Sequence, residues 1–391
     1  MRYLRTLSTR RLTVIVAVAA ALAASAAVAQ AGLIGSDPKP APKALDRAIL
    51  DAVNAPQVAG VSARISFSNA LLPSGSLPNG GASPIVTGAK GRVWITADGR
   101  FRLELQSDRG DAQIASDGKT VTVYDASSKT VYRAAEPQEK PDSATHQPAT
   151  LAGVRRALHQ LARTWTLSGA QPTSTAGRAS YTLRISPKDD GGLLGAGEIA
   201  WDAAKGVPLR AAVYAQGQSK PVLQLEATHI SFGRVSEGDL RVSVPSGVQA
   251  VDVSPPAGGH AARRGAHTDV SGVAAVQKQL GFQLSAPAKL AGLPRKEVRL
   301  VRFGNDAGAL SVYGQGFGGI AVLQRKAGGG EPQKAGRDQI QLPQVNIDGA
   351  TGTELATALG TVVDFERGGV HYTVLGSVPP VAAENAARGL R

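Results

Sequence analysis

Cysteine is absent from this sequence: none of its 391 residues is a cysteine. That absence excludes disulfide bonds, thiol nucleophiles and cysteine-ligated metal centres. Aromatic residues are also scarce, at 4% of the chain, although the apolar fraction of 42% is ordinary for a globular protein. A core must therefore be built mainly from valine, leucine, isoleucine and alanine.

Recognisable catalytic and metal-binding motifs are missing as well. No G-x-S-x-G elbow occurs, and the six histidines form no H-E-x-x-H pair. Residues 314–319, GQGFGG, match the letters of a nucleotide-binding G-x-G-x-x-G motif. They are followed by the strand pattern IAVLQ, whereas a pyrophosphate needs a helix N-terminus there. We therefore predict a protein that is not an enzyme, with no cofactor and no metal site.

The N-terminus has the pattern of an export signal. Arg2, Arg5, Arg10 and Arg11 precede an apolar run over 12–28, and small residues at 27–31 offer A-x-A cleavage sites. The pattern predicts a signal peptide over 1–31 that is cleaved after Ala29 or Ala31. The alternative is a retained N-terminal membrane anchor. Either way we expect an extracytoplasmic protein, in the periplasm or the cell-wall space.

The chain is basic, with a formal net charge of +13. The basic residues are spread through predicted strands of an exported chain, so we do not expect nucleic-acid binding. An anionic envelope surface is the expected partner of such a charge. Arg155, Arg156 and Arg163 form either a solvated helix face or a contact with an anionic lipid head group or partner.

Alternating apolar and polar residues predict many strands. In residues 91–105, GRVWITADGRFRLEL, two alternating runs flank Asp98-Gly99, which is a strong hairpin signal. Few helices accompany the strands, so the fold class is α+β. The predicted organisation is a signal peptide (1–31), a proline-rich spacer (32–43), a first domain (44–253), a linker (254–268) and a second, small α+β domain (269–391).

The apolar face of the sheet predicted for the first domain must be shielded from water. Nine or ten strands make a face of roughly 1,000 Å², of which two helices cover about 400 Å². The sheet therefore closes as a filled barrel or sandwich, or it curves around a hollow. Alternation places these sheet residues on that face: Ile65, Phe67, Val93, Ile95, Phe101, Leu103, Leu105, Leu183, Ile185, Leu209 and Val213. A helix expected over about 150–165 would face it with Leu151, Val154, Leu158, Leu161 and Trp165.

Several of these stretches resemble LolA-like periplasmic lipoprotein carriers. The 91–105 hairpin resembles their strand pair in which G-x-[LV]-W turns into F-R, and ASDGKTVTVYD resembles the hairpin that follows. Trp201, Asp202, Pro208, Leu209 and Arg210 resemble a later strand pair of the same superfamily. The resemblance covers residues 45–250. It implies an unclosed antiparallel β-barrel with capping helices around an acyl-chain cavity lined by the sheet and helix residues named above.

The second domain resembles the small C-terminal domain of RseB-type (MucB-type) periplasmic regulators. The stretches that carry this resemblance are ALSVYGQGFGGIAVLQRK and ERGGVHYTVLGSVPP. RseB-type proteins pair a LolA-like domain with such a module and bind an anti-sigma factor. The expected function is therefore binding of lipid or lipoprotein acyl chains in a half-barrel cavity. The alternative is an envelope-stress regulator that binds a membrane-bound anti-sigma factor or a similar membrane protein.

Overall fold

The computed structural model describes residues 37–72, 83–108, 110–136, 149–188, 191–253, 270–303, 306–328 and 342–390. These residues form two compact units. Among them, unit 1 holds 37–70, 83–188 and 195–253, and unit 2 holds 71–72, 191–194 and 270–390. The predicted signal peptide (1–31), the start of the predicted spacer and the predicted linker (254–268) lie outside the described residues.

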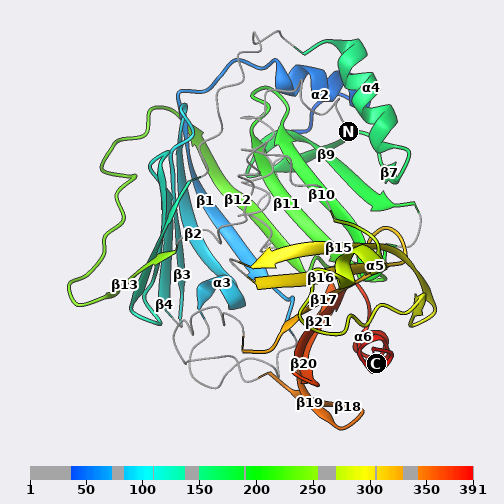
Figure 1. The fold of residues 1–391 in the computed structure, drawn as a ribbon. Coiled ribbons are helices and arrows are strands. Elements are labelled where there is room, and N and C mark those ends of the chain that lie inside the picture. The colour runs from blue at the N-terminus through cyan, green and yellow to red at the C-terminus, as the bar shows by residue number, and fades with distance from the viewer. Residues whose placement is uncertain are drawn as a thin grey trace. The chain divides into compact units, whose positions relative to one another are not determined.

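Unit 1 is mostly a single sheet of 13 strands that curls into a half-barrel (Figure 1). Period-two alternation of apolar residues runs through most of these strands, so one face can be buried while the other stays polar. In chain order the strands are β1 (Gly60–Asn69), β2 (Ala89–Thr96), β3 (Phe101–Ser107), β4 (Gly110–Ser116), β5 (Thr120–Asp125), β6 (Thr130–Ala135), β7 (Trp165–Leu167), β8 (Gln171–Thr175), β9 (Arg178–Pro187), β10 (Leu194–Asp202), β11 (Pro208–Ala215), β12 (Leu223–Phe232) and β13 (Gln249–Val253).

The sheet is open. Its order is β13-β6-β5-β4-β3-β2-β1-β12-β11-β10-β9-β7, with β8 also paired to β9, so β13 and β7 end the path. At one edge β13 runs parallel to β6, with Ala250 opposite Val131. The expected all-antiparallel sheet is therefore wrong at this edge. A parallel neighbour needs a long crossover connection. Here the chain from β6 to β13 includes β7–β12 and ends with residues 233–248.

Three helices belong to unit 1 among its described residues: α2 (Leu45–Val53), α3 (Pro84–Thr87) and α4 (Leu151–Leu161). The helix expected over about 150–165 is shorter than predicted, and Trp165 opens β7 instead. Thr-Trp-Thr is a β-branched and aromatic run that favours a strand. Its backbone finds partners on β9, where Trp165 lies opposite Pro187.

The predicted hairpin at 91–105 is confirmed as β2 and β3. Val93 lies opposite Leu103 and Ile95 opposite Phe101, and Gly99 has the positive φ of 91° that the turn requires. Opposite residues in an antiparallel pair lie on the same face. The register therefore places the apolar side chains of both strands together.

Gly91 is required in β2 by close approach rather than by its φ. A Cβ added there would collide with the carbonyl oxygen of Glu104 on β3. We expect Gly91→Ala to destabilise unit 1 by about 1–3 kcal/mol, because the two strands must separate locally. Urea unfolding followed by tryptophan fluorescence measures this loss, since all three tryptophans lie in unit 1. Gly233→Ala is the control, because nothing lies within 4 Å of its added Cβ. Equal midpoints for both variants would contradict the account.

Unit 2 is an eight-stranded sheet with helices α5 (Val273–Gln277) and α6 (Pro380–Arg388). Its order is β14-β15-β16-β17-β21-β20-β19-β18. The strands are β14 (Lys289–Leu290), β15 (Leu293–Phe303), β16 (Asp306–Tyr313), β17 (Ile320–Lys326), β18 (Gln344–Ile347), β19 (Ala350–Thr357), β20 (Gly360–Arg367) and β21 (Val370–Gly376). The GQGFGG motif connects β16 to β17, and a strand follows it as predicted.

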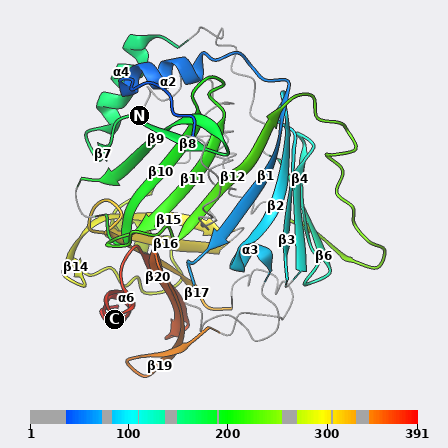
Figure 2. The same cartoon turned by 180° about the vertical axis from the view of Figure 1, so that it is seen from behind.

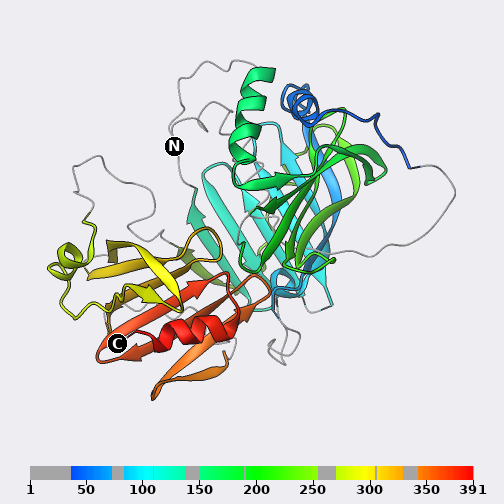
Figure 3. The ribbon, with the colours of Figure 1, turned by 90° about the vertical axis from the view of Figure 1, so that its right-hand side faces the viewer.

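The core of unit 2 lies between its sheet and α6. Val322, Val363 and Val374 are fully buried, and they pack in one cluster with Ala383 and Ala386 of the helix. Alanine on the inner side of α6 lets the helix approach the strands closely, and α6 contacts β20 and β21. Figure 3 shows α6 lying along this sheet.

Candidate functional site

The predicted lining residues of β1, β2 and β3 lie on one face, which we name the inner face of unit 1. Ile65 of β1 lies opposite Gly91, and Gly91 lies opposite Leu105. Across the same strands, Val93 pairs with Leu103. On the other side of β1, Phe67 lies opposite Leu225 of β12. The register therefore brings the predicted residues of these three strands together and continues their face onto β12.

The predicted residues of β9 and β11 lie on the same inner face. Val213 is opposite Leu223 of β12, which alternates with Leu225. On β9, Leu183 is opposite Ile199 of β10. The neighbouring residue Glu198 forms an ion pair with Arg210 of β11, which places both on the other, outer face. The alternating positions Ile199 and Leu209 must then point inward.

Burial divides the eleven predicted sheet residues into two groups. Six are buried, from Leu105 at 2% exposed to Leu183 at 7%, the others being Ile65, Phe67, Leu103 and Leu209. Five are half-buried: Val93, Ile95, Phe101, Ile185 and Val213. A side chain that is only 2–7% exposed is in contact with protein over nearly its whole surface. Much of the inner face is therefore occupied by the chain itself.

Helix α2 covers the inner face at β9 and β10. Leu183, Tyr181 and Trp201 form a cluster into which Leu45 and Ile49 of the helix pack. Tyr181 also donates a hydrogen bond of 2.7 Å to the carbonyl of Ala41, just before the helix. This side of the predicted cavity is thus a packed core.

Helix α4 packs against α2 (Figures 1 and 3). Arg155 forms a 2.7 Å ion pair with Asp46, and Asn54 bonds both the N–H and the carbonyl of Ala149 at 3.1 and 3.0 Å. Of the predicted cavity-facing residues on this helix, Val154 is buried, and three are half-buried: Leu151, Leu158 and Leu161.

The short helix α3 contacts β1, β3 and β4 (Figure 2). Ser83 caps its N-terminus by accepting from the N–H of Ile85, and the carbonyl of Ile85 accepts from Asn69 of β1 at 3.1 Å. This helix lies near the strand ends that carry Phe67, Leu105 and Ala112. Its presence there is consistent with the near-complete burial of those side chains.

The outer face carries a row of paired charges across β9–β12. Arg184 and Arg210 both pair with Glu198, at 3.4 Å for Arg184 Nη1, and Arg210 Nε lies 3.5 Å from Glu226. Arg210 also donates 2.8 Å to the side-chain oxygen of Gln224. Burial raises the pKa of Glu226, while Arg210 acts in the opposite direction. The positive charges of two arginines are therefore neutralised by the negative charges of two glutamates in this row.

A strap, residues 233–248, crosses the outer face of β3–β5 between β12 and β13. Arg100 donates two hydrogen bonds of 2.8 Å to the carboxylate of Glu237, and Arg102 donates one to the carbonyl of Asp239. Farther along, the N–H of Ser243 donates to Gln113 of β4 at 3.3 Å. No side chain of the strap is buried. The strap is therefore held mainly by polar contacts.

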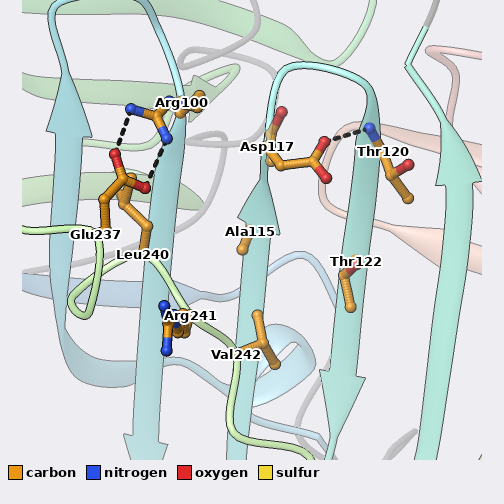
Figure 4. Close-up of a pocket in the computed structure, with 10 residues that line it drawn as sticks. Arg100, Ala115, Asp117, Thr120, Thr122, Glu237, Leu240, Arg241 and Val242 are labelled. Carbon is orange, nitrogen blue, oxygen red and sulfur yellow. Dashed lines mark hydrogen bonds and ion pairs between the residues drawn. The ribbon is translucent and has the colours of Figure 1, made fainter.

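A pocket of about 280 Å³ lies between the strap and the sheet (Figure 4). Ala115 and Thr122 form its floor, Leu240 and Val242 enter from the strap, and Asp117 lies at one end, bonded to the N–H of Thr120. Nothing in the sequence pattern indicated this pocket. It mixes apolar groups, hydroxyls and charges of both signs, so it has neither a dry lining nor a ligand set for a metal.

Arg100 and Glu237 form a two-bond ion pair, which we name the fork. Because it needs an ionised carboxylate, acid should weaken the attachment of the strap. Arg100 lowers the pKa of Glu237, and Thr96 and then Arg100 lower the pKa of Asp98. A carboxyl group whose pKa is lower in the folded protein stabilises the fold at pH values above its ordinary pKa, which is 4.5 for Glu237 and 3.8 for Asp98. This stabilisation is lost as the pH falls through the pKa of the folded state.

We therefore expect hydrogen exchange in the strap, corrected for the intrinsic rate, to accelerate below about pH 4. Glu237→Gln should show the same acceleration at neutral pH. Asp111→Asn, which changes an exposed carboxylate outside the fork, is the control. Unchanged strap exchange in Glu237→Gln would show that the fork does not hold the strap.

One cluster in unit 2 superficially resembles a catalytic set. His371 Nε2 lies 3.3 Å from Asp364 Oδ1, and Thr373 donates to the same oxygen. Although burial opposes it, the hydrogen bonds from His371 and Thr373 leave the pKa of Asp364 lowered. The carboxylate is shared, so the threonine hydroxyl is bonded to aspartate and not to the imidazole that would have to deprotonate it. This geometry does not make a nucleophile and base pair.

The described residues contain no group of three or more His, Cys, Asp or Glu side chains placed to hold a metal ion. Within the same part of the chain, no helix is long and apolar enough to cross a membrane.

Comparison with known proteins gives one family match and several distant structural ones. Residues 77–161 match the family model described as "Predicted periplasmic protein (DUF2092)". No curated protein matches the chain. Two solved complexes, MucB with MucA(peri) and the MucA/MucB complex of Pseudomonas aeruginosa, are each 17% identical and cover 88% of this chain and 96% of theirs, with a TM-score of 0.41. An uncharacterized conserved protein from Thermus thermophilus is 15% identical over 53% of this chain and 98% of its own, with a TM-score of 0.32. At these TM-scores the structural likeness supports no inference about fold or partner.

Proposed function

We propose that this protein acts by binding, and that its partner is a membrane-bound protein of the cell envelope such as an anti-sigma factor. The observation that carries the proposal is the burial of the inner face. Leu105, Ile65 and Leu209 are at most 3% exposed, because the chain itself covers them. A face that carries long acyl chains must leave apolar side chains accessible to them, since the gain of about 0.8 kcal/mol per methylene comes from burial on binding. Side chains already buried by the chain contribute none of it.

Export supports an envelope partner. The N-terminal pattern of arginines, an apolar run and small residues is typical of a secretory signal. The family model that matches residues 77–161 describes a periplasmic protein. A protein in that compartment can reach the extracytoplasmic segment of a membrane protein directly, and the resemblance of the second domain to RseB-type regulators implies the same kind of partner.

The test is capture from solubilised envelopes in mild detergent, with proteins identified by mass spectrometry. The proposal predicts one enriched membrane protein with an extracytoplasmic segment, which also binds when produced separately and mixed with the purified chain. Absence of any such protein, in preparations where the chain itself is folded, would contradict it.

Acyl-chain binding is the second candidate, favoured by the five half-buried residues of the inner face. Val93, Ile95 and Phe101 lie close together near the turn of the β2–β3 hairpin. They offer a small apolar surface that a single acyl chain could extend over. A fluorescent fatty-acid probe that binds with micromolar affinity, and that Ile95→Asp releases, would favour this candidate.

A further inference from the structure

A cluster of unpaired cations lies on the outer face of unit 1, where β1 and β2 meet. Arg64 of β1 is directly opposite Arg92 of β2, and both side chains are exposed. Lys90, two residues before Arg92, is exposed on the same face. No hydrogen bond or ion pair joins these three side chains to any described residue. We name Arg64, Lys90 and Arg92 the cation patch.

The neighbouring charges on this face are already paired. Glu104 of β3 is opposite Arg92, but it accepts a bond from Arg102. Glu226 of β12 is opposite Ser66 and pairs with Arg210. The rows on both sides of the patch are therefore balanced by their own partners, and an uncompensated charge of three remains between them.

A β-bulge borders the patch. The register between β1 and β12 shifts after Arg64, so that Arg64 is opposite His229 while Ile65 is opposite Ala227. The extra residue, Thr228, is exposed together with His229, and its hydroxyl donates to the carbonyl of Arg64 at 3.3 Å. Bulges re-aim side chains and are frequent next to functional sites. Here the bulge adds a hydroxyl and an imidazole to the surface beside two guanidinium groups.

This arrangement has a cost for folding. Like charges directly opposite each other on neighbouring strands destabilise a sheet. The same sheet places Glu198 opposite Arg184 and Glu226 opposite Arg210, whereas Arg64 is opposite another arginine. An anion bound across Arg64 and Arg92 would remove the repulsion, and arginine is well suited to phosphate oxygens.

We propose that the cation patch docks unit 1 on a phosphate-bearing lipid bilayer. The side chains of the patch are exposed on the outer face of paired strands, so the patch matches a flat anionic surface better than one small anion. Each lysine or arginine near such a surface contributes about 1 kcal/mol, a factor of about five in binding. This inference does not depend on the protein partner or the acyl chain considered under the proposed function.

The experiment is vesicle co-sedimentation with the exported form of the protein, comparing vesicles rich in phosphatidylglycerol with pure phosphatidylcholine. The wild type should bind only the anionic vesicles, and less at high salt. The Arg64→Ser/Arg92→Ser variant should bind about 25-fold more weakly. Its melting temperature should be equal to or above that of the wild type, because the repulsion is relieved. Arg64→Lys/Arg92→Lys keeps the charge and should keep binding.

The matched control is Arg299→Ser/Arg302→Ser, which removes the same charge from two exposed arginines of β15 in unit 2. It should bind as the wild type does. Equal loss in both double variants would overturn the proposal in favour of a diffuse charge effect. Failure of the wild type to bind anionic vesicles would also overturn it, as would binding of soluble glycerol phosphate without vesicle binding, which would indicate a small-anion site.

Discussion

Leu103→Arg should unfold unit 1. Leu103 is 5% exposed in the middle of β3, between Val93 of β2 and Ile114 of β4 on the inner face. A guanidinium group placed there has no acid to pair with among these apolar neighbours, and the surrounding packing leaves its stem no short way to solvent. An unpaired buried charge costs on the order of 3–5 kcal/mol, a large part of the 5–15 kcal/mol that stabilises a typical domain. Urea unfolding followed by tryptophan fluorescence should show a greatly lowered midpoint or no folded baseline.

Ala135→Arg is the matched control for that variant. Ala135 ends β6 in the same sheet, is exposed, and lies opposite the uncharged Thr120. The same side chain introduced there should leave the midpoint unchanged. A Leu103→Arg protein that unfolds at the wild-type midpoint would show that the inner face is open at this point, and acyl-chain binding would then become the better account.

Gln324→Ala should strongly destabilise unit 2. Gln324 of β17 is fully buried, and its side-chain amide forms two hydrogen bonds with the backbone of Ser285, an arrangement that we name the clasp. The amide oxygen accepts from the N–H of Ser285 at 2.9 Å, and the amide nitrogen donates to the carbonyl of Ser285 at 2.7 Å. Alanine would leave both buried backbone groups without partners and would open a cavity. Each orphaned group costs about 1–3 kcal/mol, so a total of about 3–5 kcal/mol is expected. Thermal unfolding followed by circular dichroism measures the loss.

Two comparisons make the Gln324 result specific. Lys326→Ala changes an exposed residue at the end of the same strand and should be neutral. Gln277→Ala should have a smaller effect, because Gln277 clasps the same segment at Phe282 and Leu284 but is only partly buried. A melting temperature for Gln324→Ala equal to that of Lys326→Ala would contradict the clasp.

Local patterns were sufficient to predict the hairpins and the side on which their residues lie. Alternation placed Val93 and Leu103 on one face, and Asp98-Gly99 located the turn. The degree of burial could not be predicted in the same way. Whether Leu105 faces a hollow or protein depends on what α2 and α3 cover, and their placement is set by contacts between residues far apart in the sequence.

The strap and its parallel strand were not predictable from local sequence. Residues 233–248 alternate only over the short run Leu240, Val242 and Val244, which does not show what they pack against. The ion pair that fixes them joins Arg100 to Glu237, which are 137 residues apart. The cation patch was also hidden. Arg64 and Arg92 are ordinary surface residues in their own strands, and only the register between β1 and β2 makes them neighbours.

The function of the inner face can be measured most directly by mass spectrometry of the native protein purified from the envelope. The purified protein is divided between intact native mass measurement and solvent extraction for lipid analysis. An inner face already occupied by the chain predicts the polypeptide mass alone, with lipid in the extract far below one molecule per protein. A stoichiometric lipid that adds its mass to the native protein, and that is lost in Ile95→Asp, would contradict the proposal and establish acyl-chain binding.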